Sequence, residues 1–328
     1  MVLVLGKSEI ASVFTMKDAI GSVEKAFKEL ALGSVIMPLR PTIPVKDAKG
    51  RFTLMPAYIG GTKALGVKII TAFADNPTKY ELPFIIGTVL LHSSDTGELL
   101  AIADGTYITA VRTGAAGGAS AKYLARKDAE VVGLFGTGVQ GHTNLEAVAA
   151  VRKIKKAKVV SRSAEHVKAY CSEVGKALGI DVVPAKDAKD AVSGSDIIIT
   201  TTSSQQPLFK GEWVEKGTHI IGIGSHHGPG IKEIDETAVK RSKVVVDQRE
   251  ACLAEAGDIM DPIKSGVITP DHIYAELGEI IAGKKKGREN DSEITFFKSV
   301  GLAIQDVSAI QTIYELAKKK GVGREIEI

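Results

Sequence analysis

A glycine-rich turn carries the clearest chemical signal in the sequence. Gly136, Gly138 and Gly141 directly follow the apolar run 131–135 and precede a predicted helix over about residues 142–151. In this context the first glycine permits a tight turn, the second lets the backbone approach a pyrophosphate, and the third lets helix and strand pack closely. Amides at the helix N-terminus would bind the phosphates. The turn predicts a dinucleotide site made by Gly136, Gly138, Val139, Gln140 and Gly141.

The end of the next strand distinguishes NAD from NADP. An acidic residue about 20 positions beyond the turn would accept a hydrogen bond from the ribose 2′-hydroxyl. Ser161 stands at that distance from Gly141, and Arg162 and Ser163 follow it. Because an arginine can bind a 2′-phosphate through paired hydrogen bonds, Ser161 and Arg162 favour NADP(H). NAD(H) is the alternative if Arg162 stacks on adenine or faces solvent.

Two later loops are candidates for the same site. In parallel sheets, ligands bind beyond the carboxyl ends of the strands. Thr201 and Thr202 follow one predicted strand, and Gly224 and Ser225 follow the next. Their hydroxyls and glycine suit contacts to a cofactor or substrate, although ordinary turns use the same residues.

The order of elements predicts the fold class. From residue 130 on, short unbroken apolar runs alternate with helical stretches, which is typical of a parallel sheet covered on both faces. Six runs match a Rossmann-type doubly wound sheet: 131–135, 158–160, 181–183, 196–199, 219–223 and 244–246. Elsewhere the patterns predict helices over 16–32, 109–124, 164–178 and 296–318, and strands over 67–73 and 84–91. The last helix could return to the first domain.

Composition limits the classes of partner. A chain of 328 residues fits about two domains, and a net charge of +3 gives no reason to expect nucleic acid or a membrane surface as partner. Cys171 and Cys252 lie far apart and lack metal-ligand spacing, so we expect neither a disulfide framework nor a metal site. Without a signal sequence or a long apolar span, the chain is predicted to be soluble and cytoplasmic.

Several motifs together resemble one family. The chain resembles the ornithine cyclodeaminase and mu-crystallin family, which includes archaeal-type alanine dehydrogenases and cyclic ketimine reductases. The resemblance covers nearly the whole chain. Its carriers are MPLR at 37–40, MPAY at 55–58, GVK at 66–68, DG at 104–105, TAVRTGAA at 109–116, the glycine turn, DIIITTT at 196–202, FKGEWV at 209–214, AELGE at 275–279 and FKSVGLAIQD at 297–306.

The resemblance implies an organisation and a set of roles. It implies a homodimer whose substrate-binding and dimerisation domain, of α+β type, comprises residues 1–118 and 300–328, with a dinucleotide-binding domain over 119–299. Arg40, Lys68 and Arg112 match the family positions around the substrate carboxylate and reacting carbon. Arginine can clamp a carboxylate, and a buried lysine can exchange a proton with an amine or imine. Thr113, beside Arg112, is expected to contact the cofactor.

One departure from the family pattern concerns the chemistry. Family members carry an aspartate in the segment after the fifth strand, but the corresponding segment here, 224–230, has none. His226 in this segment is a candidate acid or base, and the alternative is a loop residue with no chemical role. A cyclodeaminase threonine is replaced by Phe84. These differences argue against a faithful copy of the cyclodeaminase site. The missing aspartate and the missing acid at the cofactor ribose favour an NADP(H)-dependent oxidoreductase acting on an α-imino acid or L-amino acid, of the ketimine reductase or alanine dehydrogenase type. The alternatives are ornithine cyclodeaminase, an ammonia lyase with tightly bound NAD, and a non-catalytic mu-crystallin-like binding protein, against which Lys68 and Arg112 count.

Overall fold

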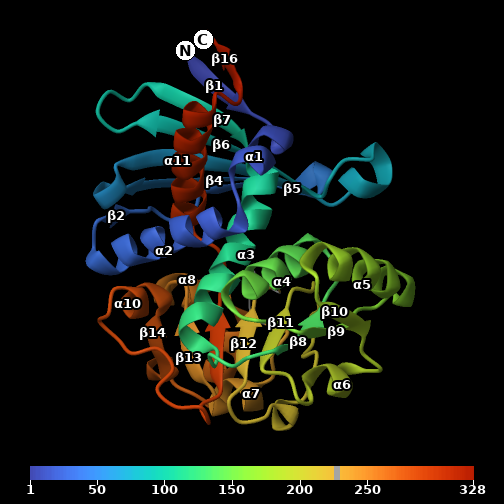
Figure 1. Cartoon of the computed structure of the whole chain (residues 1–328). Helices are drawn as coiled ribbons and strands as arrows, with labels where there is room; N and C mark the ends of the chain where they lie inside the picture. Colours follow the sequence, from blue (N-terminus) through green and yellow to red (C-terminus); the bar gives the residue numbers. More distant parts are fainter. Residues whose placement is uncertain (225–229) are drawn as a thin grey trace. The chain divides into compact units, whose positions relative to one another are not determined.

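The chain folds into two compact units. The computed structural model describes residues 1–224 and 230–328 (Figure 1). Unit 1 comprises Met1–Arg112 with Leu302–Ile328, and unit 2 comprises Thr113–Gly301. The sequence placed the first boundary at 118/119, whereas the compact units divide at 112/113, within the helix α3 (Gly105–Leu124). The functional roles assigned to the two units remain predictions.

Unit 1 is built on an eight-stranded sheet. Its strand order is β16-β1-β7-β6-β5-β4-β2, and β3 also pairs with β4. The strands are β1 (Val2–Leu5), β2 (Val35–Ile36), β3 (Thr42–Val45), β4 (Gly50–Ile59), β5 (Ala64–Phe73), β6 (Ile85–Ser93), β7 (Leu99–Asp104) and β16 (Arg324–Ile326). The helices are α1 (Lys7–Val13), α2 (Met16–Leu32) and α11 (Ala303–Lys320). All pairings in this sheet are antiparallel except that of β1 with β7.

The helix α2 has the bounds that its sequence predicts. Thr15 and Asp18 form a capping box at its start, and Gly33 ends it with a φ of 78°. Val23 and Phe27 are buried on its apolar side. α11 packs against α2 and against β4, β5 and β6, so the tail does return to the first unit (Figure 1).

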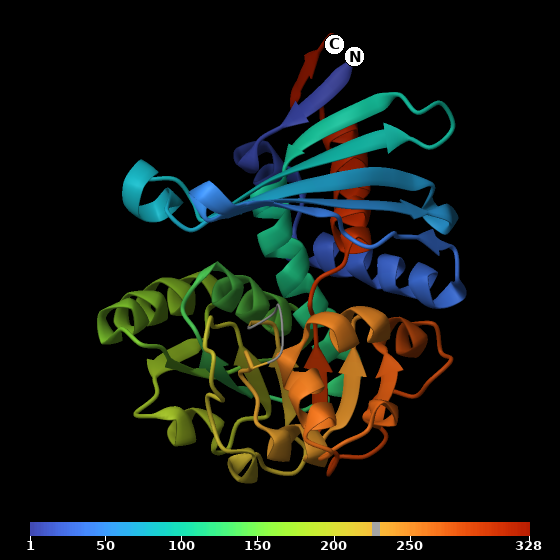
Figure 2. The same ribbon diagram turned by 180° about the vertical axis from the view of Figure 1, so that it is seen from behind.

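Unit 2 contains an all-parallel sheet. Its order is β10-β9-β8-β11-β12-β15-β13-β14 (Figure 2). The strands are β8 (Val131–Phe135), β9 (Lys156–Val160), β10 (Asp181–Pro184), β11 (Ile197–Thr200), β12 (His219–Gly222), β13 (Lys243–Val246), β14 (Ile273–Glu276) and β15 (Thr295–Lys298). The helices are α4 (Val139–Val151), α5 (Ala164–Leu178), α6 (Ala188–Val192), α7 (Glu236–Arg241), α8 (Arg249–Glu255), α9 (Gly257–Lys264) and α10 (Leu277–Ile281). Every residue of β11, β12 and β15 is buried, as expected for strands covered on both faces.

The predicted helix over 296–318 is wrong in its first turns. Residues Thr295–Lys298 form β15, and α11 begins only at Ala303. Phe296 and Phe297 are fully buried between β12 and β13, and Gly301, with a φ of 79°, separates strand from helix. β14 was not predicted either, so the sheet of unit 2 contains two strands, β14 and β15, beyond the six that the sequence predicted. Among the described residues, the model contains no helix long and apolar enough to cross a membrane.

Candidate active site

The glycine turn has the geometry that its sequence predicts. It follows β8 directly, and α4 begins at Val139 with Gly138 as its N-cap residue. Gly136 has a φ of 104°, where a side chain would be strained, and a Cβ on Gly141 would lie 2.3 Å from the Gly136 oxygen. A Cβ on Gly138 would meet nothing within 4 Å. The turn therefore leaves open space at the helix N-terminus.

The candidate 2′-phosphate residues lie beside this turn. The Gly136 amide donates a 3.0 Å hydrogen bond to the Val160 oxygen, at the end of β9. Ser161 and Arg162 come next, and Arg162 is exposed. The Ser163 hydroxyl caps α5 by accepting from the His166 amide. Arg162 is thus placed near the turn with its side chain accessible.

The hydroxyls of Thr201 and Thr202, which follow β11, donate hydrogen bonds to other groups of the protein. Thr201 donates from Oγ1 to the Phe135 oxygen at 3.1 Å, and Thr202 donates from Oγ1 to Glu233 at 2.6 Å. A Cβ on Gly136 would lie 2.8 Å from Thr201 Oγ1, so these residues border the glycine turn. Their expected cofactor contacts, and that of buried Gly224, remain predictions.

The structure describes Thr113 but not Ser225 or His226. Ser225 and His226 fall within 225–229, so their predicted roles lie outside the described residues. Thr113 is buried in α3. Its neighbour Gly114 lies so near α4 that a Cβ there would stand 2.4 Å from the Thr143 oxygen.

A buried ion cluster in unit 1 joins two of the predicted basic residues. Lys68 on β5 is 1% exposed, and its Nζ lies 2.7 Å from Asp306 Oδ2 on α11. Arg112 on α3 donates from Nε to Asp306 Oδ1 at 3.0 Å and from Nη1 to Gln305 Oε1 at 2.7 Å. Thr109 lies 3.4 Å from Lys68 Nζ. The lysine and the arginine therefore share one carboxylate.

Burial and the neighbouring charges shift the pKa of Lys68. Burial, together with the positive charges of Arg112 and Arg40, lowers the pKa of Lys68 to about 8, although the Asp306 carboxylate opposes the shift. Arg40, which is partly buried, is thus close enough for its charge to act on Lys68. A lysine with this pKa can both donate and accept a proton near neutral pH.

Asp306 and Gln305 were not predicted as site residues. Both are fully buried on α11. The sequence did contain a signal for Asp306, because this acid lies on the apolar face of a predicted helix, with Ala303, Val307 and Ile310. A buried acidic side chain is unfavourable unless it is paired with a basic group.

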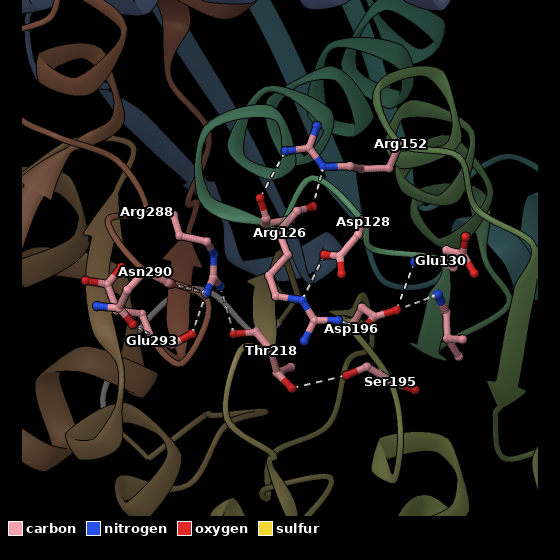
Figure 3. A network of polar contacts seen from close by, with 12 residues as sticks. Arg126, Asp128, Glu130, Arg152, Ser195, Asp196, Thr218, Arg288, Asn290 and Glu293 are labelled. Atoms are coloured by element: carbon pink, nitrogen blue, oxygen red, sulfur yellow. Dashed lines mark hydrogen bonds and ion pairs between the residues drawn. The ribbon is translucent and has the colours of Figure 1, made fainter.

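Figure 3 shows a second polar network in unit 2. Glu130, Asp196 and Thr218 of this network directly precede β8, β11 and β12, whereas the glycine turn follows the end of β8. Asp196, just before β11, accepts from Arg126 Nη2 at 2.5 Å and from the Glu130 and Val131 amides at 2.8 and 2.9 Å. Arg288 donates to backbone oxygens, including that of Glu293 at 2.7 Å. Because these bonds tie strand starts and loops together, the network is structural.

The fold and these sites define a class of protein. A dinucleotide-type turn on a parallel sheet, with a buried lysine and arginine in the other unit, is suited to an enzyme that uses a nicotinamide cofactor on a small carboxylate substrate. The chain belongs to the ornithine cyclodeaminase/mu-crystallin family, whose model matches residues 2–321. The predicted family and fold class are thereby confirmed.

Individual relatives are similar over their whole length. The chain is 44% identical to Δ1-pyrroline-2-carboxylate reductase of Thermococcus litoralis, solved with NADH and L-proline, with a TM-score of 0.94 over 99% of this chain and 100% of that one. It is 42% identical to alanine dehydrogenase of Archaeoglobus fulgidus, covering 99% of this chain and 98% of the relative. An archaeal alanine dehydrogenase dimer with bound NAD gives a TM-score of 0.92 at 40% identity, over 100% of this chain and 99% of that one.

Proposed function

We propose that this protein reduces an α-imino acid to an L-amino acid with NADPH, or catalyses the reverse oxidation. At the coarser level, it is an NAD(P)-dependent oxidoreductase acting on C=N or CH–NH2 groups, as its named relatives are. The observation that carries the proposal is the buried cluster in which Lys68 and Arg112 share Asp306.

Each residue of the buried cluster has a separate role in the proposed reaction. When bound, the nicotinamide supplies or accepts the hydride at the α-carbon. Arg112, assisted by Arg40, binds the substrate carboxylate. In reduction, Lys68 donates a proton to the substrate nitrogen, and in oxidation it accepts one. Asp306 orients both basic side chains and offsets part of their charge.

Cofactor preference and location are the finer parts of the proposal. Exposed Arg162, beside the glycine turn and with no acid at the end of β9, supports NADP(H). The solved relatives named above hold NADH or NAD, so NAD(H) is the competing outcome. Cys171 and Cys252 are buried free thiols, which suits the cytoplasm that we propose as the location.

We also propose that the protein is a homodimer formed through the sheet of unit 1. In β4 to β7 alternate residues are buried, and α11 packs against β4, β5 and β6. The other face carries a partly exposed apolar row across four paired strands, made by Pro56, Val67, Leu90 and Ile102. An apolar face of this kind is suited to an isologous contact with a second copy.

One assay separates the candidate functions. NADPH or NADH absorbance is followed with Δ1-pyrroline-2-carboxylate and with pyruvate plus ammonia, and ammonia release is followed with L-ornithine. The proposal predicts cofactor oxidation with an imino acid, faster with NADPH. Ammonia release from ornithine without net cofactor change would instead identify a cyclodeaminase, and no turnover with cofactor bound would indicate a binding protein.

A further inference from the structure

A buried charge cluster in unit 2 lies outside the chemistry described so far. It comprises Lys298, at the end of β15, with Asp258 on α9 and Glu233, and all three side chains are fully buried. Lys298 Nζ lies 2.5 Å from Asp258 Oδ2. Because an unpaired buried charge is costly, such a cluster needs a structural or functional reason.

The cluster binds the ends of two strands. Lys298 Nζ donates a 2.8 Å hydrogen bond to the Gly224 oxygen, just beyond β12. Glu233 Oε1 accepts from the Thr202 amide at 2.5 Å and from its hydroxyl at 2.6 Å, just beyond β11. Asp258 Oδ1 holds the Glu233 backbone by accepting from its amide at 2.8 Å. Three charged side chains thus fix the backbone at the carboxyl edge of the sheet.

We call Thr201, Thr202 and Gly224 the carboxyl-edge shelf. A Cβ on Gly224 would lie 2.2 Å from the Thr202 oxygen, so the shelf is closely packed. A Cβ on Gly136 would lie 2.8 Å from Thr201 Oγ1 and 3.2 Å from Thr202 Cγ2. The shelf therefore borders the glycine turn, on the edge where parallel sheets bind ligands.

We propose that Lys298, with Asp258 and Glu233, is a positioning cluster that holds the carboxyl-edge shelf in the shape that binds the nicotinamide cofactor. The inference rests on the proposed function, because it takes the ligand of this edge to be that cofactor. Burial alone would lower the pKa of Lys298, but the carboxylates of Asp258 and Glu233 raise it overall, so the lysine stays charged as a donor to Gly224. The cluster acts through the shelf and touches no reacting atom.

The test replaces both members of the Lys298–Asp258 ion pair in one variant. Removing one member of a buried pair is strongly destabilising, whereas replacing both members is often tolerated. The double variant Lys298→Met/Asp258→Asn keeps side chains of similar size and loses the donor to Gly224. We expect it to fold and the dissociation constant for NADPH, measured by nucleotide fluorescence, to rise about tenfold or more, the effect of losing a hydrogen bond to a charged group. Glu233→Gln is the milder second variant, with an expected rise of about threefold from weakened charge-assisted bonds to Thr202.

The matched control lies at the other end of β11. Asp196→Asn disturbs an ion pair of equal length, Asp196 to Arg126 at 2.5 Å, in the structural network of Figure 3. We expect it to lower the melting temperature while the dissociation constant for NADPH stays within about twofold of wild type, because stability and distant binding are separable.

The outcomes are distinguishable. Unchanged NADPH affinity in the folded double variant and in Glu233→Gln overturns the positioning role, as does an equal loss of affinity in Asp196→Asn. Wild-type protein that binds NADPH but reduces no imino acid refutes the proposed reaction and leaves the binding comparison valid. Wild-type protein that binds neither NADPH nor NADH overturns both.

Discussion

Replacing Asp306 with asparagine should move the pH dependence of catalysis. In the wild type, Lys68 has a pKa of about 8, and the Asp306 carboxylate 2.7 Å from its Nζ favours the charged form. The substitution would keep the size of the side chain and remove its charge. Because the attraction of the Asp306 carboxylate would be lost while burial and the charges of Arg112 and Arg40 remain, the pKa of Lys68 should fall.

The size of the shift follows from the geometry. An opposite charge at this range moves a pKa by about 1–3 units, so Asp306→Asn should bring Lys68 from about 8 to about 5–7. At pH 7.5 the protonated fraction would then fall from about three-quarters to about one-quarter or less. In reduction, where the ammonium is the proton donor, the alkaline limb of kcat/KM therefore moves to lower pH. In oxidation, where the neutral amine is the acceptor, the acidic limb moves in the same direction.

The assay is a pair of pH profiles of kcat/KM, one for each direction of the reaction. Ser308→Ala is the matched control, because Ser308 lies on the same helix and donates a buried 2.7 Å bond to the Ser22 oxygen. It should lower the melting temperature without moving either limb. Lys68→Ala should abolish the limb and lower kcat by about 10²–10⁴-fold. A folded Asp306→Asn protein whose limbs stay near pH 8 would refute the role given to this carboxylate.

The remaining predictions concern binding, assembly and stability. Arg112→Ala should mainly raise KM for the imino acid, since the arginine binds the carboxylate in ground and transition states alike; a normal KM would contradict this. Arg162→Asp should shift the ratio of NADPH to NADH dissociation constants by about tenfold towards NADH, and an unchanged ratio would remove Arg162 from cofactor selection. In light scattering, Leu90→Lys should give a monomer while Leu32→Lys, an exposed position on α2, stays dimeric. Burial lowers the pKa of His219 well below its usual value, so at low pH the unfolded chain takes up a proton that the folded chain excludes. The free energy of unfolding, measured in urea, should therefore fall as the pH drops below about 6.5, by up to about 1.4 kcal/mol per pH unit. The fall should be smaller in His219→Gln.

Local signals predicted the elements that have them. α2 and α5 match their predicted bounds because apolar spacing coincides with a polar cap at the start and a left-handed glycine at the end, Gly33 and Gly179. The glycine turn was predictable for the same reason, since strand, turn and helix follow one another within a few residues. β15 was missed because its phenylalanines run on into the apolar face of α11, and only Gly301 marks the break.

Contacts between distant segments were harder to predict. Lys68, Arg112 and Asp306 come from β5, α3 and α11, and the sequence does not show that one carboxylate serves both basic groups. The same holds for Glu233, which lies in a loop and becomes significant only through its bonds to Thr202. The hydrogen bond from the Thr202 hydroxyl to Glu233 could not be predicted from the sequence either, and the expected contact of Thr202 with the cofactor stays a prediction.

The most direct test of the central claim is the fate of the transferred hydrogen. The protein is incubated with NADPH that carries deuterium in place of both hydrogens at the nicotinamide C4, together with Δ1-pyrroline-2-carboxylate or with pyruvate and ammonia, and the amino acid product is analysed by mass spectrometry and NMR. Net hydride transfer to the imino carbon predicts one deuterium on the α-carbon of the L-amino acid for each NADPH oxidised. NADPH oxidation without deuterium at that carbon, or no labelled amino acid from either substrate, would contradict the account.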